Sequence, residues 1–132
     1  MAKRRLSISL PEGLAKEFDE VVKKTKQPTR SHAIESAMRE YIISNKWMSG
    51  KGKTVGAILL TYNHDTRGIN EDLVDIQHAY ESIISASLHI HLDKHQCLEI
   101  IAVRGEIKEI KELVRDLHNK KGILSLKVVT AA

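Results

Sequence analysis

Apolar and polar residues alternate along residues 5–10, the pattern of a half-buried strand. The apolar positions Leu6, Ile8 and Leu10 share one face, so Arg5, Ser7 and Ser9 share the other. Pro11 ends this strand and suits the first turn of a helix. An amphipathic helix is predicted next, because apolar residues recur there at helical spacing: Leu14, Phe18, Val21 and Val22.

A second helix is predicted after Pro28, with Thr29 or Ser31 as its cap. Its apolar stripe is formed by Ala33, Ile34, Ala37, Met38, Tyr41 and Ile42. This βαα unit, residues 1–45, is too small to bury a core alone, and its single strand has unpaired edges. We therefore predict that two copies pair their strands into a ribbon. The outer face of that ribbon carries Arg5, Ser7 and Ser9 twice and fits the major groove of DNA.

Residues 46–53 contain two glycines and three lysines without a clear period. This composition is typical of a linker, into which the second helix can extend before it breaks. We take residues 46–53 as the boundary between the βαα unit and the rest of the chain.

Residues 54–132 read as a βαββαβ unit, which is the ferredoxin-like arrangement. Strands are predicted at 54–62, 85–93, 97–103 and 123–129. One predicted helix is capped by Asn70, and its apolar face extends from Leu73 through Ile83 and Ile84; the other helix follows Gly105 and stops near Gly122. The whole chain is thus of the α+β class. Its helices cover one sheet face, and a second copy is the simplest cover for the other.

Charge is divided unevenly over the 132 residues. Residues 1–53 carry 12 basic and 6 acidic side chains, a net of +6, whereas the remainder has a net of −2. A basic N-terminal part indicates a polyanionic partner such as DNA. The single cysteine excludes an intrachain disulfide and fits a reducing cytoplasm. No apolar run approaches the ~20 residues of a membrane helix, so no membrane association is expected.

Three side chains in the C-terminal part combine nitrogen and sulfur donors. His89 and His91 lie two residues apart on one strand and share a face, and Cys97 opens the next strand after a short polar turn. Such donors suit a borderline transition metal rather than magnesium or calcium. His78 lies roughly 140° around its helix from Leu73, off the apolar stripe. As a ligand, His78 would therefore serve a site shared between subunits.

The segments Leu6–Pro11 and Thr29–Ile34 resemble the ribbon-helix-helix DNA-binding family. Behind them, Gln77-His78, Leu88–His91 and Cys97–Glu99 resemble the nickel-responsive NikR regulators, which add an ACT-like domain. The resemblance implies base reading by Arg5, Ser7 and Ser9, and phosphate contacts by Arg30 and Ser31. It also implies one square-planar Ni(II) per chain, held by the following set: His78, His89, His91 and Cys97.

The same resemblance implies a homotetramer, a dimer of dimers, in which nickel promotes binding to a palindromic operator and often represses nickel uptake genes. Tyr62, Gln77 and Glu99 are candidate partners that orient the ligand rings, because they lie beside ligands or on an adjacent strand. The chain departs from the family at His32 and Ser36, where relatives commonly place acidic residues that can bind a second cation. A second cation site is therefore not implied here.

Three alternatives remain open at the level of sequence. Residue types alone favour zinc for a site of cysteine and histidine, so the protein would be a zinc-dependent regulator or a zinc-stabilised structural protein. A metal-independent repressor, whose ACT-like domain binds a small molecule, is the second alternative. An enzyme is the third, but no orienting group or oxyanion motif accompanies Cys97 as a nucleophile. We therefore expect no catalytic residues.

Overall fold

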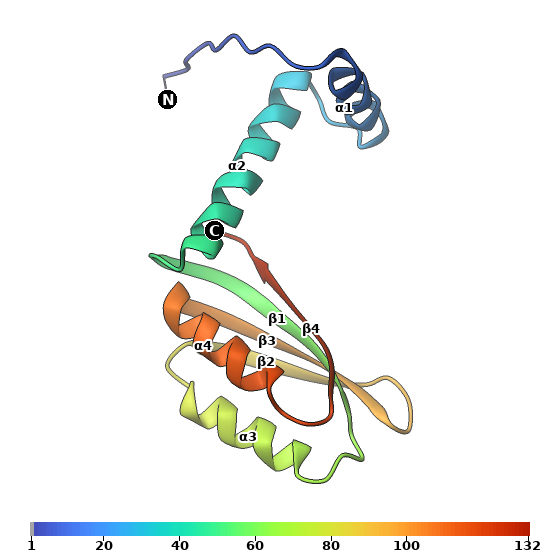
Figure 1. Ribbon diagram of the computed structural model, residues 1–132, viewed down its shortest axis with the longest axis vertical. Coiled ribbons are helices and arrows are strands. Elements are labelled where there is room, and N and C mark those ends of the chain that lie inside the picture. Colours follow the sequence, from blue (N-terminus) through green and yellow to red (C-terminus); the bar gives the residue numbers. More distant parts are fainter. Residues whose placement is uncertain (1) are drawn as a thin grey trace. The chain divides into compact units, whose positions relative to one another are not determined.

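The computed structural model describes residues 2–132, and the chain divides into two compact units with the boundary between Tyr41 and Ile42. The elements follow the order α1 (Glu12–Lys24), α2 (Arg30–Ser49), β1 (Lys53–Asn63), α3 (Ile69–Ala79), β2 (Ile84–His91), β3 (Gln96–Glu106), α4 (Ile107–His118) and β4 (Ile123–Thr130) (Figure 1). Two N-terminal helices and a βαββαβ unit confirm the predicted α+β class.

Helices α1 and α2 form as the sequence predicts, and local contacts fix their ends. The hydroxyl of Thr29 accepts a hydrogen bond from the backbone N–H of His32 at 3.0 Å, so Thr29, and not Ser31, caps α2. Arg30, at the first position of α2, forms a two-pronged ion pair with Asp19 of α1, with N···O distances of 2.6 and 2.9 Å. This pair ties the start of α2 to α1.

The predicted strand at residues 5–10 is absent from the single chain. A strand is defined by backbone hydrogen bonds to a neighbour, and no segment among residues 2–132 pairs with residues 5–10. Leu6 and Ile8 are 70% and 64% exposed, and in the whole unit Met1–Tyr41 the described residues include one buried side chain, Ala33. An exposed apolar segment and a single buried side chain among the described residues keep the expectation that this unit pairs with a second copy.

Residues 46–49, which the sequence places in a linker that the second helix can enter, continue α2 to Ser49. The reason is tertiary packing, because Trp47 packs against the core of the C-terminal unit and Lys111 lies over its ring, 5.3 Å from the centroid. Gly50 then ends the helix with a φ of 70°, a left-handed conformation that favours glycine. Among residues 2–132, neither α2 nor any other helix combines the length and apolar character needed to cross a bilayer.

The four strands form one antiparallel sheet in the order β2-β3-β1-β4, and α3 and α4 lie on the same side of it (Figure 1). Alternate residues of β1 and β3 point into this helix-covered side, where Ile58 and Leu60 of β1 and Ile101 and Val103 of β3 are buried. Helix α4 adds Ile110, Leu113 and Leu117, which complete an aliphatic core. The order is that of a ferredoxin-like domain, as predicted.

The other sheet face carries apolar side chains without helical cover. Leu88 of β2 is 56% exposed, and Val129 of β4 is 57% exposed. Both alternate with polar residues or with residues that face the helices. Contiguous apolar exposure on a sheet indicates an interaction surface. The expectation that a second copy covers this face therefore stands as a prediction.

Helix α3 ends at Ala79, five residues earlier than the apolar pattern predicts. Tyr80 terminates the helix, Ile83 is buried in the following turn, and Ile84 already belongs to β2. A Cβ on Gly105 would lie 2.8 Å from the side chain of Ile83, so glycine at this position lets the turn pack closely. The helical spacing of Ile83 and Ile84 thus reflects burial in a turn and a strand, which periodicity alone cannot distinguish from a helix.

The core position Leu113 gives a direct test of this packing. Leu113→Ala leaves a cavity beneath α4, where the leucine is fully buried, and should lower the free energy of unfolding by about 2–5 kcal/mol. Lys108→Ala, at an exposed position of the same helix, should change it little. Urea unfolding at one fixed protein concentration measures both. Equal losses in the two variants would contradict the assigned core.

Candidate metal centre

The hairpin of β2 and β3 brings His91 opposite Cys97 and His89 opposite Glu99. The turn between the strands depends on Asp93, whose carboxylate accepts hydrogen bonds from the backbone N–H groups of His95 and Gln96 at 2.7 and 2.8 Å. A short polar side chain that bonds its own backbone two residues on is a typical turn former. The sequence Asp93–Gln96 therefore sets the register that places the thiol beside the imidazoles.

The structure gathers three of the four predicted ligands. One donor atom from each of His89, His91 and Cys97 lies within 4.8 Å of the others, and the Cys97 Sγ is 3.6 Å from His91 Nδ1. Ligand bonds of ~2.0–2.3 Å place two ligands of one ion at most about 4.5 Å apart, so small side-chain movements are enough. The histidines are exposed and the cysteine is buried, so the group opens to solvent on its histidine side.

Tyr62 of β1 lies beneath this group, as predicted from its place on the adjacent strand. Its hydroxyl is 3.3 Å from His89 Nε2, and the rings meet edge to face with their centroids 5.9 Å apart. Burial, and then the neighbouring Cys97 and Glu99, raise the pKa of Tyr62 well above its ordinary value, so the hydroxyl stays protonated. The contact of the Tyr62 hydroxyl with Nε2 restricts the orientation of the His89 ring.

Gln77 and Glu99 form the second polar contact near the group. The Gln77 side-chain N–H donates to the Glu99 carboxylate at 3.0 Å, and this bond joins α3 to β3. Glu99 is buried, and desolvation raises its pKa, although Gln77 and His89 act in the opposite direction. The contact ties the helix that carries His78 to the strand that carries Cys97.

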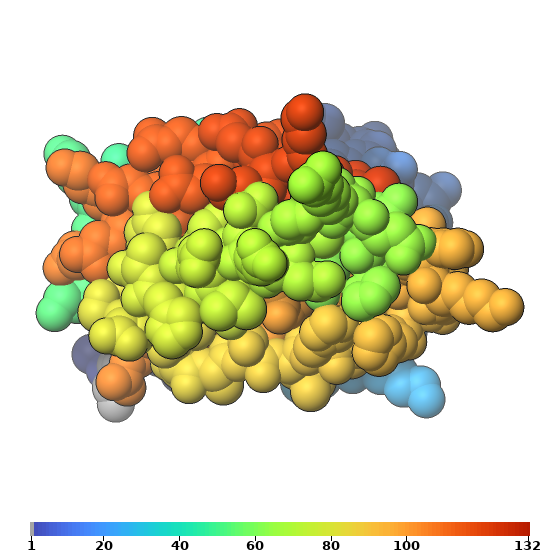
Figure 2. Space-filling model, turned by 90° about the horizontal axis from the view of Figure 1, so that it is seen from below, coloured from blue at the N-terminus to red at the C-terminus, as the bar shows by residue number. Residues whose placement is uncertain are grey.

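His78 stands apart from the other three predicted ligands. It is exposed on α3, as its helical position predicts, and it is not a member of the group formed by His89, His91 and Cys97. Instead it borders a shallow hollow between α3 and the start of β2, together with Val74 and Ser87. Figure 2 shows this face, with α3 and α4 side by side and β2 along the lower edge.

The predicted DNA-contacting residues all lie at exposed positions. Arg5, Ser7 and Ser9 are exposed in the extended N-terminal segment, and Arg30 and Ser31 are exposed in the first turn of α2. The ion pair with Asp19 holds the guanidinium of Arg30 and raises its pKa, first through the hydrogen bond and then through charge. A phosphate contact by Arg30 therefore has to compete with Asp19 for the guanidinium.

Sequence reasoning missed one neighbour of the group, His64, which follows β1. Its ring meets that of His91 edge to face, with the centroids 6.1 Å apart. Its Nδ1 is buried and has no hydrogen-bond partner within residues 2–132. The only available signal was that His64 follows Tyr62 by two residues, which on a straight strand would place both on one face.

Taken together, the structure has a helical N-terminal unit and a ferredoxin-like domain that carries a group of donor atoms able to hold a transition metal. Residues 55–131 match the family described as the NikR C-terminal nickel-binding domain, and residues 4–43 match the ribbon-helix-helix proteins of the copG family. The two matches cover the two predicted parts of the chain.

Full-length relatives agree with these family matches. Proteins named "Putative nickel-responsive regulator" are 42% identical over 129 residues in Methanothrix thermoacetophila and 46% identical over 125 residues in Methanocaldococcus jannaschii. The alignments span 97% and 94% of this chain and 92% and 89% of those relatives. The chain therefore belongs to the nickel-responsive regulator (NikR) family.

Solved structures with low sequence identity support the fold alone. The uncharacterized protein TM1266 from Thermotoga maritima superposes with a TM-score of 0.56 at 12% identity, over 61% of this chain and all of its own. The ACT domain from a GTP pyrophosphokinase of Chlorobium tepidum gives a TM-score of 0.50 at 10% identity, over 59% of this chain and all of its own. The C-terminal unit is thus ACT-like, as predicted.

Tyr62→Phe tests whether the tyrosine hydroxyl orients His89. The substitution keeps the buried ring but removes the oxygen 3.3 Å from Nε2, and should weaken nickel binding about 10-fold. Tyr80→Phe is the matched control, because the Tyr80 hydroxyl donates to Asp116 instead, a contact that raises its pKa to about 12. Competition with a nickel chelator measures both affinities. Equal affinities in the Tyr62 variant and the wild type would show that this contact does not support the site.

Proposed function

We propose that this chain is a nickel-responsive, DNA-binding transcriptional regulator whose metal site promotes operator binding. The observation that carries the proposal is the group of His89, His91 and Cys97, which lies inside a domain matched to the NikR nickel-binding family. Two imidazoles and a thiolate are donors that nickel, copper and zinc accept, and the family match favours nickel.

In this proposal the three clustered residues form most of one Ni(II) site per chain, and His78 of a partner subunit completes it. Two features support the shared site. His78 is exposed and lies outside the group of its own chain, and the imidazoles of that group are open to solvent. Nickel would link the two subunits, because each contributes ligands to the same ion and neither can complete the coordination alone.

DNA binding is assigned to the N-terminal unit, residues 1–45, and metal binding to residues 54–132. The exposed Leu6, Ile8 and Leu10 would be buried when two N-terminal segments pair. Pairing leaves Arg5, Ser7 and Ser9 facing outward to read base edges, while Arg30 and Ser31 at the start of α2 contact phosphate. The assembly is proposed to be a homotetramer that meets two half-sites of a palindromic operator.

Metal can change operator affinity only by favouring one arrangement of the protein over others. A ligand on α3 that bonds to a neighbouring subunit restricts how the subunits are placed. The Gln77–Glu99 hydrogen bond links α3 to β3, the strand that carries Cys97. A restriction on α3 would therefore also act on that strand. Nickel would thus bias the assembly towards a spacing of the two ribbons that suits the operator.

Nickel-dependent operator binding gives the first test. One equivalent of nickel per chain should raise the operator affinity of the wild type. By thermodynamic linkage, operator DNA should raise the nickel affinity by the same factor. Cys97→Ala should abolish the increase but keep metal-independent binding, which weakens steeply with salt as phosphate contacts release counterions. Fluorescence anisotropy of a labelled operator measures these affinities. Equal affinity with and without nickel in the wild type would contradict the proposal, and a response to zinc alone would replace nickel with zinc.

A mixing experiment tests whether ligands come from two subunits. His78→Ala and Cys97→Ala each remove one ligand from every site, so each variant alone should lose tight nickel binding. When equal amounts are unfolded together and refolded, about one quarter of the sites should regain all their ligands if the site is shared across subunits. Nickel absorption bands measure the recovered fraction. No recovery in the mixture would place all ligands in one chain.

A further inference from the structure

Two loops meet beside the proposed nickel ligands, and none of the residues that join them is itself a proposed ligand. One loop follows Asn63, the last residue of β1, and contains His64 and Asp65; the other is the turn between β2 and β3, which contains Asp93 and His95. Figure 2 shows the first loop next to the projecting turn at one end of the sheet. The turn separates His91 from Cys97, so its position bears directly on both residues.

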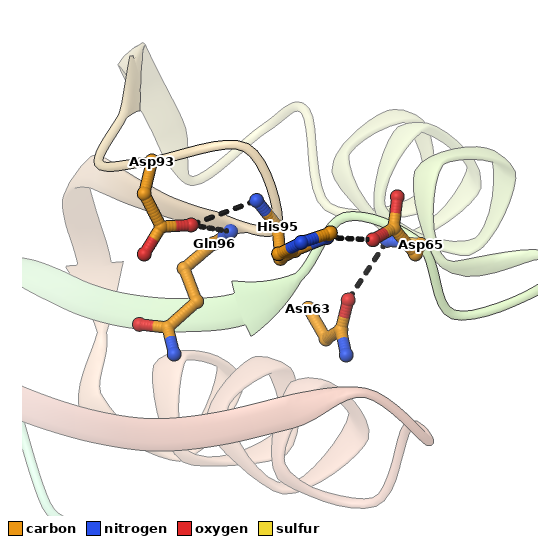
Figure 3. A network of polar contacts seen from close by, with 5 residues as sticks. All are labelled: Asn63, Asp65, Asp93, His95 and Gln96. Carbon is orange, nitrogen blue, oxygen red and sulfur yellow. Dashed lines mark hydrogen bonds and ion pairs between the residues drawn. The ribbon is translucent and has the colours of Figure 1, made fainter.

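Two polar contacts join the two loops, and a third orders the first loop locally. The His95 ring bonds to the carboxylate of Asp65, and the backbone N–H of His64 donates to the carbonyl oxygen of His95 at 2.6 Å. The Asn63 side chain accepts a hydrogen bond from the backbone N–H of Asp65 at 2.9 Å, which holds the backbone that carries this carboxylate. Figure 3 shows the ring of His95 and the carboxylate of Asp65 pointing at one another, with Asp93 anchoring the other side of the turn.

This arrangement also places a side chain against a proposed ligand. The backbone of His64 is held by His95, and the His64 ring meets that of His91 edge to face, with the centroids 6.1 Å apart; the His64 Nδ1 is buried. His91 is otherwise exposed on an edge strand, where side-chain freedom is large. The loop contacts therefore restrict a ligand that its own strand leaves mobile.

We propose that Asp65 and His95 are positioning residues, which clasp the two loops together and so hold His91 and Cys97 in the arrangement that binds nickel. The proposal rests on the proposed nickel site and extends it to two residues that touch no metal. Both side chains are more than half exposed, so the pair contributes little to the stability of the fold. Its effect falls on the local geometry of the turn, to which a multi-ligand site is sensitive.

The test is a double-mutant cycle on nickel binding by the full chain. Asp65→Ala and His95→Ala should each weaken the affinity for substoichiometric Ni(II) about three- to fivefold and speed its transfer to a chelator. The double variant should be no worse than either single variant, because all three lose the same contact. Asp65→Glu, which retains a carboxylate, should recover most of the affinity.

The matched control is Glu35→Ala, which breaks the Glu35–Arg39 ion pair of α2, with side chains of similar exposure to those of Asp65 and His95. It should leave nickel binding unchanged, and all variants should unfold in urea like the apo wild type. If the Asp65 and His95 variants bind nickel as tightly as the control, the proposed clasp is wrong. Losses of affinity that add in the double variant would also overturn the clasp, and neither result would affect the proposed function. No nickel binding by the wild type overturns the proposed function and the clasp together.

Discussion

The proposed metal-binding group of His89, His91 and Cys97 depends above all on the backbone register between β2 and β3. His91 faces Cys97 across this hairpin because Asp93 closes a short turn with its own side chain. A shift of one residue would reverse the faces of the ligands, sending both imidazoles to the open side of the sheet. The buried Tyr62 and Glu99 then bound the site from below, so the core of the domain and the group of donor atoms are built from the same strands.

Incomplete burial is the second constraint, and it supports the proposal that the functional unit contains more than one chain. The N-terminal unit has an exposed apolar segment and one buried side chain among its described residues, and the sheet of the C-terminal unit leaves an apolar face open. The proposed metal site is also incomplete in one chain, because His78 lies outside the group formed by His89, His91 and Cys97. Association of subunits would satisfy the apolar surfaces and the coordination at once.

Sequence periodicity predicted the βαββαβ order and the shared face of His89 and His91, because both follow from alternation along single strands. The short turn between the two strands predicted that Cys97 lies beside them. The end of α3 was wrong, since Ile83 and Ile84 are buried at helical spacing although they lie in a turn and a strand. The sequence allowed the second helix to extend into the linker, but not how far, because the packing of Trp47 against the core leaves no local pattern.

Contacts between loops are harder to predict from the sequence. Asp65 and His95 are 30 residues apart and meet only because β1 and β3 pair side by side. Likewise, the engagement of Arg30 by Asp19 could not be read from the motif that made Arg30 a phosphate contact. Sequence motifs identified candidate residues in both units, whereas tertiary contacts decide which of these side chains are free to bind DNA or metal.

The most direct test of the central claim is a crystal structure of the nickel-loaded protein, with anomalous diffraction recorded at the nickel absorption edge. The account predicts one nickel peak per chain, bonded by the Cys97 Sγ, by one nitrogen each of His89 and His91, and by His78 of the partner subunit. A nickel ion bound elsewhere, or one whose ligands all come from a single chain, would contradict the account.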